Sequence, residues 1–354
     1  MHTYAKSEII TMDTKHHSDT NSDGIDQAKV LIWAVVVERP WKEQLVEGRQ
    51  AFSSDFVATI SHPVNELRGH AEYRGSFLEV IHQAMPDLER RVDLFFAGHW
   101  DGRCCGGAGY WVTIHGHFVG KFTGALWGIE PHGQTTHLRV GEFYRVEDGK
   151  IVEARIIVDL VDLARQTGRR ILPPAKGHEH VVPGPSKGAG ILVHRRAGLV
   201  HVDLDTPQSC LLLVEQMISG LGRFDGGSLQ SMGMRAYWDP DMMWYGPGGI
   251  GTTRSIEGFE AHHQKPFLAA IPDRKGGNHR ARIGEDPFAA STGWPSIHAT
   301  STGPYLGIAP SFKPVTMRVM DWWRMEGNLL KENWVLIDLP NFFLQLGVDL
   351  LQER

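Results

Sequence analysis

The strongest constraint in the sequence is an internal repeat. At an offset of 179 residues (302 − 123), residues 123–168 align with residues 302–347 without a gap, and 14 of these 46 positions are identical. The identities include Asp159 with Asp338, each of which follows an apolar run. Self-similarity of this length indicates one folding unit that occurs twice. Any chemistry is therefore expected twice, at Asp159 and at Asp338.

Local patterns predict the same order of elements in both copies. Period-2 patterns with β-branched and aromatic residues predict strands over 110–118, 139–146 and 150–160, and over 315–325 and 329–339. Asp148-Gly149 and Gly327-Asn328 are turn pairs, so the last two strands of each copy are expected to form an antiparallel hairpin. Helices are expected at 206–219, with Thr206 as N-cap, and near 76–85 and 258–270. Helices followed by strands predict an α+β fold rather than βαβ units.

The length of the chain agrees with two domains. It has 354 residues, about twice the usual length of one domain. Residues 172–190 are rich in proline and glycine, which is typical of a linker. We divide the chain into a disordered N-terminal segment (1–26), a first domain (27–171), a linker (172–205) and a second domain (206–354).

Composition narrows the class of protein. The net charge is −5 (36 − 41), and the basic residues are scattered rather than clustered, so no nucleic-acid partner is expected. The early apolar run over 30–37 is far shorter than the roughly 20 residues that a membrane span needs. The N-terminus lacks the apolar core of a signal peptide, and three cysteines make no disulfide framework. We expect a cytoplasmic protein without a membrane partner.

The end of each copy resembles a known family. In the first copy Gly149-Lys-Ile-Val-Glu153 is followed by Asp159, Leu163 and then Gln166-Thr-Gly168. This series resembles the closing signature of the SnoaL-like polyketide cyclases, in the nuclear transport factor 2-like superfamily, and the resemblance covers residues 28–170 and 206–350. It implies two tandem cone-shaped α+β barrel domains of nuclear transport factor 2-like or cystatin-like type, each a curved antiparallel sheet wrapped by helices.

The resemblance also implies a chemistry. It implies cofactor-independent acid/base catalysis, as aldol cyclisation, isomerisation or dehydration, on a small hydrophobic carbonyl compound. In these cyclases an Asp on the last strand, seven residues before a Gln, is the acid/base, and Asp159 and Asp338 match that position. The family's His on the preceding strand is replaced by Glu142 and Asp321. The implied catalytic candidates are therefore Asp338, Asp159, Asp321 and Glu142.

Two interpretations of Asp159 and Asp338 remain open. A carboxylate within apolar walls has a raised pKa and can remove a proton next to a carbonyl. Replacement of each Asp by Asn is then expected to leave folding intact and abolish turnover. In the structural alternative, the Asp caps the following helix or turn, or pairs with Arg139 or Arg155.

Strand alternation supplies candidates for the cavity walls. If the two Asp residues face cavities, Arg155 and Ile157 do so in the first copy, and Trp334 and Leu336 in the second. Glu142 is expected to share its face with Tyr144, and Asp321 with Trp323. The alternative for these tryptophans is that they belong to the core. The candidates for substrate binding are Trp334, Trp323, Trp244, Tyr245, Trp294, His263, His298, Tyr144, Arg155, His115 and His117.

The histidines raise the question of a metal. His115 and His117 alternate onto one strand face, as paired ligands do in some barrels. The second copy has Trp294 and Ser296 there, and no third ligand follows at a diagnostic spacing, so we expect no metal and no cofactor. His262-His263 belongs either to a cavity mouth or to a solvated helix face.

Two classes of function therefore remain. One is an enzyme of the cyclase, isomerase or lyase kind, with one or both copies active, and the other is a non-catalytic small-molecule-binding or scaffold protein. An open cavity that touches its Asp favours the enzyme, whereas cavities filled by aromatic side chains exclude it. The two domains are expected to pair through the outer faces of their sheets as an internal pseudo-dimer, with a homodimer as the other option.

Overall fold

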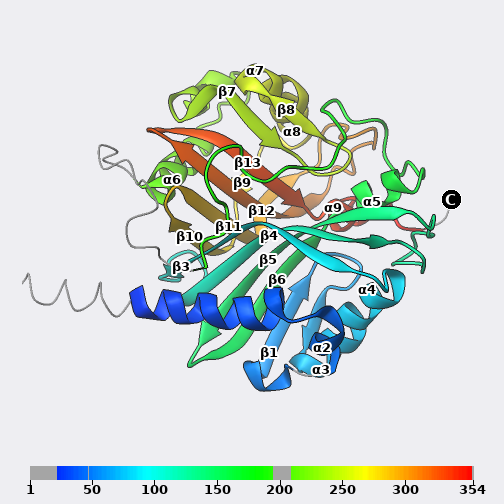
Figure 1. The fold of residues 1–354 in the computed structure, drawn as a ribbon. Helices are drawn as coiled ribbons and strands as arrows, with labels where there is room; N and C mark the ends of the chain where they lie inside the picture. Colours follow the sequence, from blue (N-terminus) through cyan, green and yellow to red (C-terminus); the bar gives the residue numbers. More distant parts are fainter. Residues whose placement is uncertain (1–21, 47, 194–208, 353–354) are drawn as a thin grey trace, which may run out of the picture.

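The computed structural model describes residues 22–46, 48–193 and 209–352, and Figure 1 shows two α+β domains packed together. Residues 22–26, expected in a disordered segment, are helical, while residues 1–21 of that segment lie outside the described residues. The expected cap Thr206 also lies outside them. Ser209 caps the helix instead, since its side chain accepts a hydrogen bond from the Leu212 backbone N–H.

Domain 1 contains, within the described residues, a six-stranded sheet of order β2-β1-β6-β5-β4-β3. Neighbouring strands are antiparallel except β1 and β6, which run parallel. The three strands predicted in this copy are confirmed as β4, β5 and β6. The strands are β1 (Phe52–Ile60), β2 (Glu66–Arg68), β3 (Glu89–Trp100), β4 (Gly109–Lys121), β5 (Thr135–Glu147) and β6 (Lys150–Val158).

Domain 2 repeats this plan. In the part of the chain that the structure describes, its sheet has the order β10-β11-β12-β13-β7-β8, with β9 paired to β11. The predicted hairpin is confirmed as β12 and β13, which pair antiparallel, while β13 and β7 are parallel. Both sheets are open rather than closed barrels. The strands are β7 (Trp238–Tyr245), β8 (Thr252–Arg254), β9 (Lys275–Gly276), β10 (His279–Glu285), β11 (Phe288–Thr300), β12 (Pro314–Glu326) and β13 (Leu329–Ile337).

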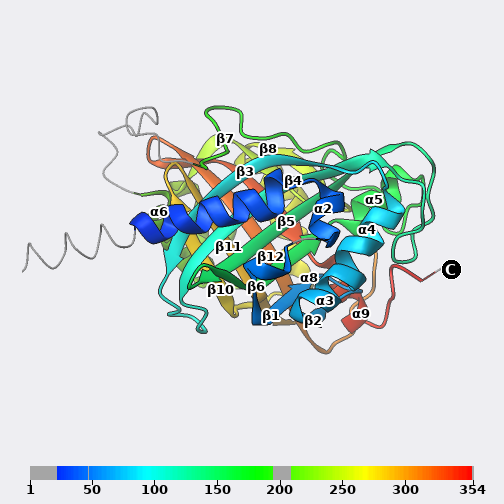
Figure 2. The same cartoon turned by 60° about the horizontal axis from the view of Figure 1, so that its bottom comes forward.

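Helices cover one face of each sheet. Figure 2 shows the N-terminal helix, α2, α3 and α4 together on one side of the domain 1 sheet. No described helix is long and apolar enough to cross a membrane. The helices are 22–32 continued by η1 (Trp33–Glu38), α2 (Trp41–Val46), η2 (Arg49–Ala51), α3 (Gly69–Tyr73), η3 (Arg74–Leu78), α4 (Glu79–Ala84), α5 (Leu160–Gln166), α6 (Cys210–Leu221), η4 (Leu229–Met232), η5 (Met234–Ala236), α7 (Ser255–Phe259), η6 (Glu260–Gln264), α8 (Lys265–Ala270) and α9 (Leu339–Gln345).

The other faces of the two sheets pack against each other. Successive side chains of a strand point to opposite faces, and Trp322 accordingly belongs to the core between the domains, while Trp323 belongs to the core of domain 2. The Trp322 indole Nε1–H donates to Thr113 Oγ1 across this interface at 2.8 Å. The expected internal pairing of the outer faces is present, while pairing between two chains stays a prediction. The interface core includes Phe96, Trp100, Trp111, Phe143, Tyr245, Phe288, Trp322 and Trp334.

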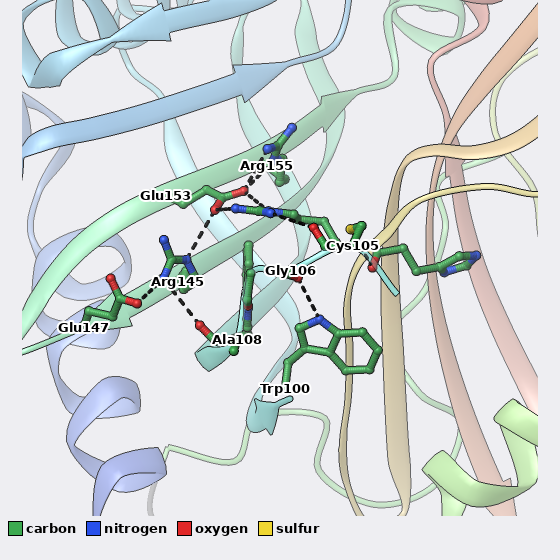
Figure 3. A network of polar contacts seen from close by, with 12 residues as sticks. Trp100, Cys105, Gly106, Ala108, Arg145, Glu147, Glu153 and Arg155 are labelled. Atoms are coloured by element: carbon green, nitrogen blue, oxygen red, sulfur yellow. Dashed lines mark hydrogen bonds and ion pairs between the residues drawn. The ribbon is translucent and has the colours of Figure 1, made fainter. Parts of the chain in front are cut away.

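A polar network borders this apolar interface. Glu153 of β6 lies beside Arg145 and Arg155, as Figure 3 shows. Arg280 of domain 2 also donates to Glu153, from Nε at 2.8 Å and from Nη2 at 2.6 Å. One largely buried carboxylate thereby holds arginines from both domains. A buried ionic network of this kind is weak evidence for stability, and here it connects the two domains.

Candidate active site in domain 2

A cavity of about 230 Å³ lies between the sheet and the helices of domain 2. It is larger than an engineered apolar cavity of about 150 Å³ that binds benzene. Its walls are mostly apolar, and its aromatic members are Trp238, Trp244, Phe259, Phe267 and Trp323. The polar residues of the cavity wall are His263, Gln264, Arg274, His279, Ser291, Ser296, Asp321 and Asn333. A mostly apolar cavity with few polar groups is typical of a small-molecule site.

Asp321 is the one carboxylate among the described residues that line this cavity. It lies in the middle of β12, opposite Ser291 of β11 and Val335 of β13. No Lys, Arg or His of the described chain forms an ion pair with it. Burial raises the pKa of Asp321 to about 7, against a smaller opposing effect of the Asn333 amide. The carboxyl therefore exists in both protonation states near neutral pH.

The two cavity histidines are neutral at that pH. Burial lowers the pKa of His263 to about 3, with a contribution from the positive charge of Arg274. Burial likewise lowers the pKa of His279 to about 3, and Arg282 adds to this effect. His263 stacks on Trp244, with 4.3 Å between ring centroids. These rings are walls and potential hydrogen-bonding groups rather than cations.

The corresponding part of domain 1, within the described residues, is filled by side chains. Glu142, aligned with Asp321, is fully buried and forms an ion pair with Arg90, whose guanidinium lies over the Phe118 ring at 4.8 Å. The Tyr144 hydroxyl donates to Glu142 at 2.8 Å, so the expected shared face of these two residues is confirmed. The space beside Tyr73 measures about 10 Å³.

One position explains the difference between the two domains. Arg90 of β3 pairs in register with Phe118 of β4, and Gly276 of β9 pairs with Ile297 of β11. Phe118 and Ile297 are related by the repeat offset (297 − 118 = 179), so Gly276 occupies the place of Arg90. Domain 1 therefore fills its cavity with an arginine that neutralises its carboxylate. Domain 2 has a glycine there, which leaves the cavity open and Asp321 unpaired.

Asp159 and Asp338 both cap helices. Asp159 Oδ1 accepts from the Asp162 backbone N–H at 3.1 Å, and its Oδ2 accepts from Arg139 Nη2 at 3.0 Å. Asp338 accepts from the Asn341 N–H and from Arg318 Nη1, both at 3.1 Å. The structural alternative of a helix cap is thus confirmed for both residues, and so is the Arg139 partner of Asp159, while Asp338 pairs with Arg318. A catalytic role for either stays a prediction.

Each capping Asp also reaches the other domain. The Gly248 backbone N–H of domain 2 donates to Asp159 Oδ2 at 2.9 Å, and the His62 N–H of domain 1 donates to Asp338 Oδ2 at 3.0 Å. Asp338 does not line the cavity, and Asp159 borders only a space of about 20 Å³ at the domain seam. The repeated Asp positions therefore join the domains, and the cavity touches Asp321 instead.

Some candidates for substrate binding lie in the cavity, and others do not. Asp321, Trp323, Trp244 and His263 are brought together there. Trp334 and Tyr245 stack on each other in the core between the domains, with ring centroids 5.2 Å apart. The expected orientation of Trp334 and Leu336 toward the cavity is wrong, because the strand ends at Ile337. Asp338 already has helix-cap geometry, so alternation cannot be counted from it.

The remaining candidates lie elsewhere. His298 is exposed on β11, and the Arg155 guanidinium lies over the Trp294 ring at 5.6 Å. Near the domain seam, Nδ1 of His115 and of His117 lie 3.6 and 3.3 Å from Asp93 Oδ2. The described residues contain no group of three or more His, Cys, Asp or Glu side chains placed to hold a metal ion.

Sequence reasoning missed Trp238, Arg274, His279, Asn333 and the aliphatic residues Val335 and Ile337 of the cavity wall. The wall residues on β13 could have been predicted from the pairing of the two strands of the hairpin. Directly opposed residues of antiparallel strands share a face, and Asp321 pairs with Val335 while Trp323 pairs with Asn333. Counting from Asp321 across the hairpin gives the correct face once the bulge between Arg324 and Met325 is included.

Comparison with known proteins identifies the family. The sequence profile of the SnoaL-like polyketide cyclases matches residues 37–167 and again residues 227–346, together more than half of the chain. The chain therefore belongs to this family and contains two tandem domains of the nuclear transport factor 2-like fold. No curated protein matches the chain.

Three of the solved structures that are similar to this chain each match between 38% and 40% of it. IdmH from Streptomyces antibioticus is 23% identical over 38% of this chain and 98% of its own, with a TM-score of 0.30. AclR from Streptomyces galilaeus is 20% identical over 38% of this chain and 78% of its own, with a TM-score of 0.31. A SnoaL-like polyketide cyclase from Agrobacterium tumefaciens is 14% identical over 40% and 99%, with a TM-score of 0.31. Sequence identities this low do not assign the reaction or substrate of these proteins to this chain.

Proposed function

We propose that domain 2 is a cofactor-independent acid/base catalyst that acts on a small hydrophobic carbonyl compound, with Asp321 as the proton-transferring group. The observation that carries this proposal is an unpaired carboxyl with a pKa of about 7 in a mostly apolar cavity of about 230 Å³. A general base works best when its pKa lies near the working pH. Domain 1 serves as the packing partner.

The proposed step is a proton transfer at carbon. The Asp321 carboxylate takes a proton from the carbon next to the carbonyl, and the C–H electron pair moves toward the carbonyl oxygen to give an enolate. The protonated Asp321 then returns a proton to the enolate carbon. In a dehydration it instead protonates a leaving hydroxyl, while the enolate electrons form a C=C bond and the C–O bond breaks to release water. The indole N–H groups of Trp238 and Trp323 have no acceptor among the described residues, which makes them candidate donors to the enolate oxygen.

Hydrogen exchange of a model ketone tests the step without knowledge of the substrate. 2-Tetralone, a two-ring apolar ketone, is incubated with the full chain in D₂O, and loss of the α-proton signal is followed by NMR. We expect acceleration that rises with pH around a midpoint near 7, because the carboxylate is the base. Asp321→Asn should lower the enzyme-dependent rate by about 100-fold or more.

A second variant tests whether the open cavity is required. Gly276→Arg places an arginine where domain 1 has Arg90, and a Cβ at Gly276 meets no atom within 4 Å. The new guanidinium should pair with Asp321, lower its pKa and abolish exchange while the protein stays folded. The matched control is Glu142→Gln in domain 1, which should retain the rate under conditions where circular dichroism shows it to be folded.

Other outcomes of these experiments would point to a different base or to a different function. A rate that is unchanged in Asp321→Asn but lost in a folded Asp338→Asn or Asp159→Asn variant would return the base to the capping positions. Binding of 2-tetralone without any acceleration would favour a small-molecule-binding protein over an enzyme.

A further inference from the structure

A second charged group in the same cavity has no counter-ion. Arg274 follows α8 and lines the cavity beside Leu221 and Gly276. Its Nη2 donates to the Leu221 carbonyl at 3.2 Å and to Met232 Sδ at 3.3 Å, while its Nε is buried without a hydrogen-bond partner. No carboxylate of the described residues forms an ion pair with it.

Three buried arginines of the described chain are each paired with a carboxylate. Arg90, Arg139 and Arg324 are buried, and their guanidinium groups lie against Glu142, Asp159 and Glu332. For Arg274, burial lowers the pKa and no neighbouring acid opposes that effect. A largely buried guanidinium that lacks a carboxylate carries a desolvation cost that an anionic ligand would offset.

Arg274 and Asp321 do not neutralise each other. The positive charge of Arg274 contributes to the lowered pKa of His263, and both side chains line the cavity. Among the described residues Arg274 forms no ion pair with Asp321, which lines the same cavity. The cavity is thus lined by one positive group and one titrating carboxyl that do not pair with each other.

The filled domain has no such arginine. Asp87 of domain 1 accepts from the Lys121 N–H at 2.7 Å, as Asp273 of domain 2 accepts from the Thr300 N–H at 2.8 Å (300 − 121 = 179). The residue after each Asp therefore corresponds, and Arg274 takes the place of the apolar Leu88. At this position a positive charge is therefore present in domain 2 and absent from domain 1.

We infer that Arg274 binds a carboxylate of the ligand, so that the cavity takes a one- or two-ring carbonyl compound with a free carboxylate. The ring system packs among Trp244, Trp323 and their apolar neighbours, and the planar guanidinium matches a carboxylate in shape and charge. The assignment of the reactive carbon to Asp321 rests on the proposed function above, whereas the carboxylate site does not.

A matched pair of probes tests the carboxylate site by binding alone. 2-Naphthoate and its neutral isostere 2-naphthamide are titrated into the full chain by calorimetry at pH 7. We expect 2-naphthoate to bind about tenfold more tightly or better, as a charge-assisted contact predicts. Arg274→Met should remove this preference by weakening the binding of 2-naphthoate far more than that of 2-naphthamide. Arg274→Lys should retain part of it.

Two controls distinguish a lost carboxylate site from a loss of folding and from an effect of Asp321. Thermal unfolding by circular dichroism checks that both Arg274 variants remain folded, and Asp321→Asn should bind 2-naphthoate at least as tightly as the wild type. Equal binding of the two probes, no binding of either, or a preference that survives in Arg274→Met would overturn the carboxylate site. The 2-tetralone exchange assay, which uses a neutral ketone, would still decide the role of Asp321.

Discussion

At the scale of the residue, Asp321 couples the proposed chemistry to stability. Its folded pKa of about 7 lies above the value of about 3.9 expected in an unfolded chain. Between these values the folded state keeps a proton that the unfolded state releases, so stability falls as pH rises through this range and is constant above it. The free energy of unfolding is therefore lower when Asp321 is ionised in its mostly apolar cavity.

The consequence is measurable with Asp321→Asn, which cannot ionise. Between pH 5 and pH 8 the wild type should lose on the order of 2 to 3 kcal/mol relative to the variant. Urea unfolding of both proteins at the two pH values checks this difference. The control is Glu142→Gln, which leaves the buried Arg90 unpaired and should destabilise the protein at both pH values. An equal offset between wild type and Asp321→Asn at pH 5 and pH 8 would mean that Asp321 is ionised throughout.

At the scale of the element, the repeat and the local patterns predicted the hairpin β12–β13 and the helices that precede it. They did not predict which strand face meets the cavity. That depends on the bulge between Arg324 and Met325, where one residue changes the pairing, and on the end of β13 before Asp338. The open cavity was also not predictable from the strand pattern. It depends on Gly276, which lies outside the gapless repeat and is placed only by the pairing of β9 with β11.

The helix α9 offers a test of the capping role of its Asp. Asp338→Ala removes the acceptor for the Asn341 N–H and the partner of Arg318. We expect a loss of about 3 to 5 kcal/mol in unfolding free energy, as for other broken buried pairs. Asp338→Asn keeps an acceptor for the cap and should lose less. Urea unfolding measures both changes, and the 2-tetralone rate of the folded Asn variant should stay at the wild-type level.

A catalytic Asp338 would give the opposite pattern. Its replacement by Asn would abolish exchange with little change in the urea midpoint. The matched variants Asp159→Ala and Asp159→Asn in α5 should repeat the stability effects of the Asp338 pair, because Asp159 makes the equivalent contacts with Asp162 and Arg139.

At the scale of the whole molecule, the residues that the two copies share and the residues that differ between them lie in different places. The repeated Arg139–Asp159 and Arg318–Asp338 pairs lie where the domains meet, and each Asp accepts an N–H from the other domain. Their identity in both copies follows from a shared task at the interface. The residues that differ between the copies, such as Arg90 and Gly276, decide which domain has a cavity.

This division predicts that the domains unfold as one unit through the interface around Trp322. Its indole packs against Phe143, with 5.6 Å between ring centroids, and donates to Thr113. A Cβ added at Gly141 would lie 2.2 Å from Trp322 Cη2, so the fit is close. Trp322→Ala should cost about 3 to 5 kcal/mol and split a single unfolding transition into two, because each domain keeps its own helix-covered core. Calorimetry and tryptophan fluorescence, recorded together, check this, and Phe312→Ala, at a side chain that is 72% exposed, is the control that should change neither. Two transitions already present in the wild type would show that the domains unfold independently, and that the interface only places domain 1 beside the cavity-bearing domain.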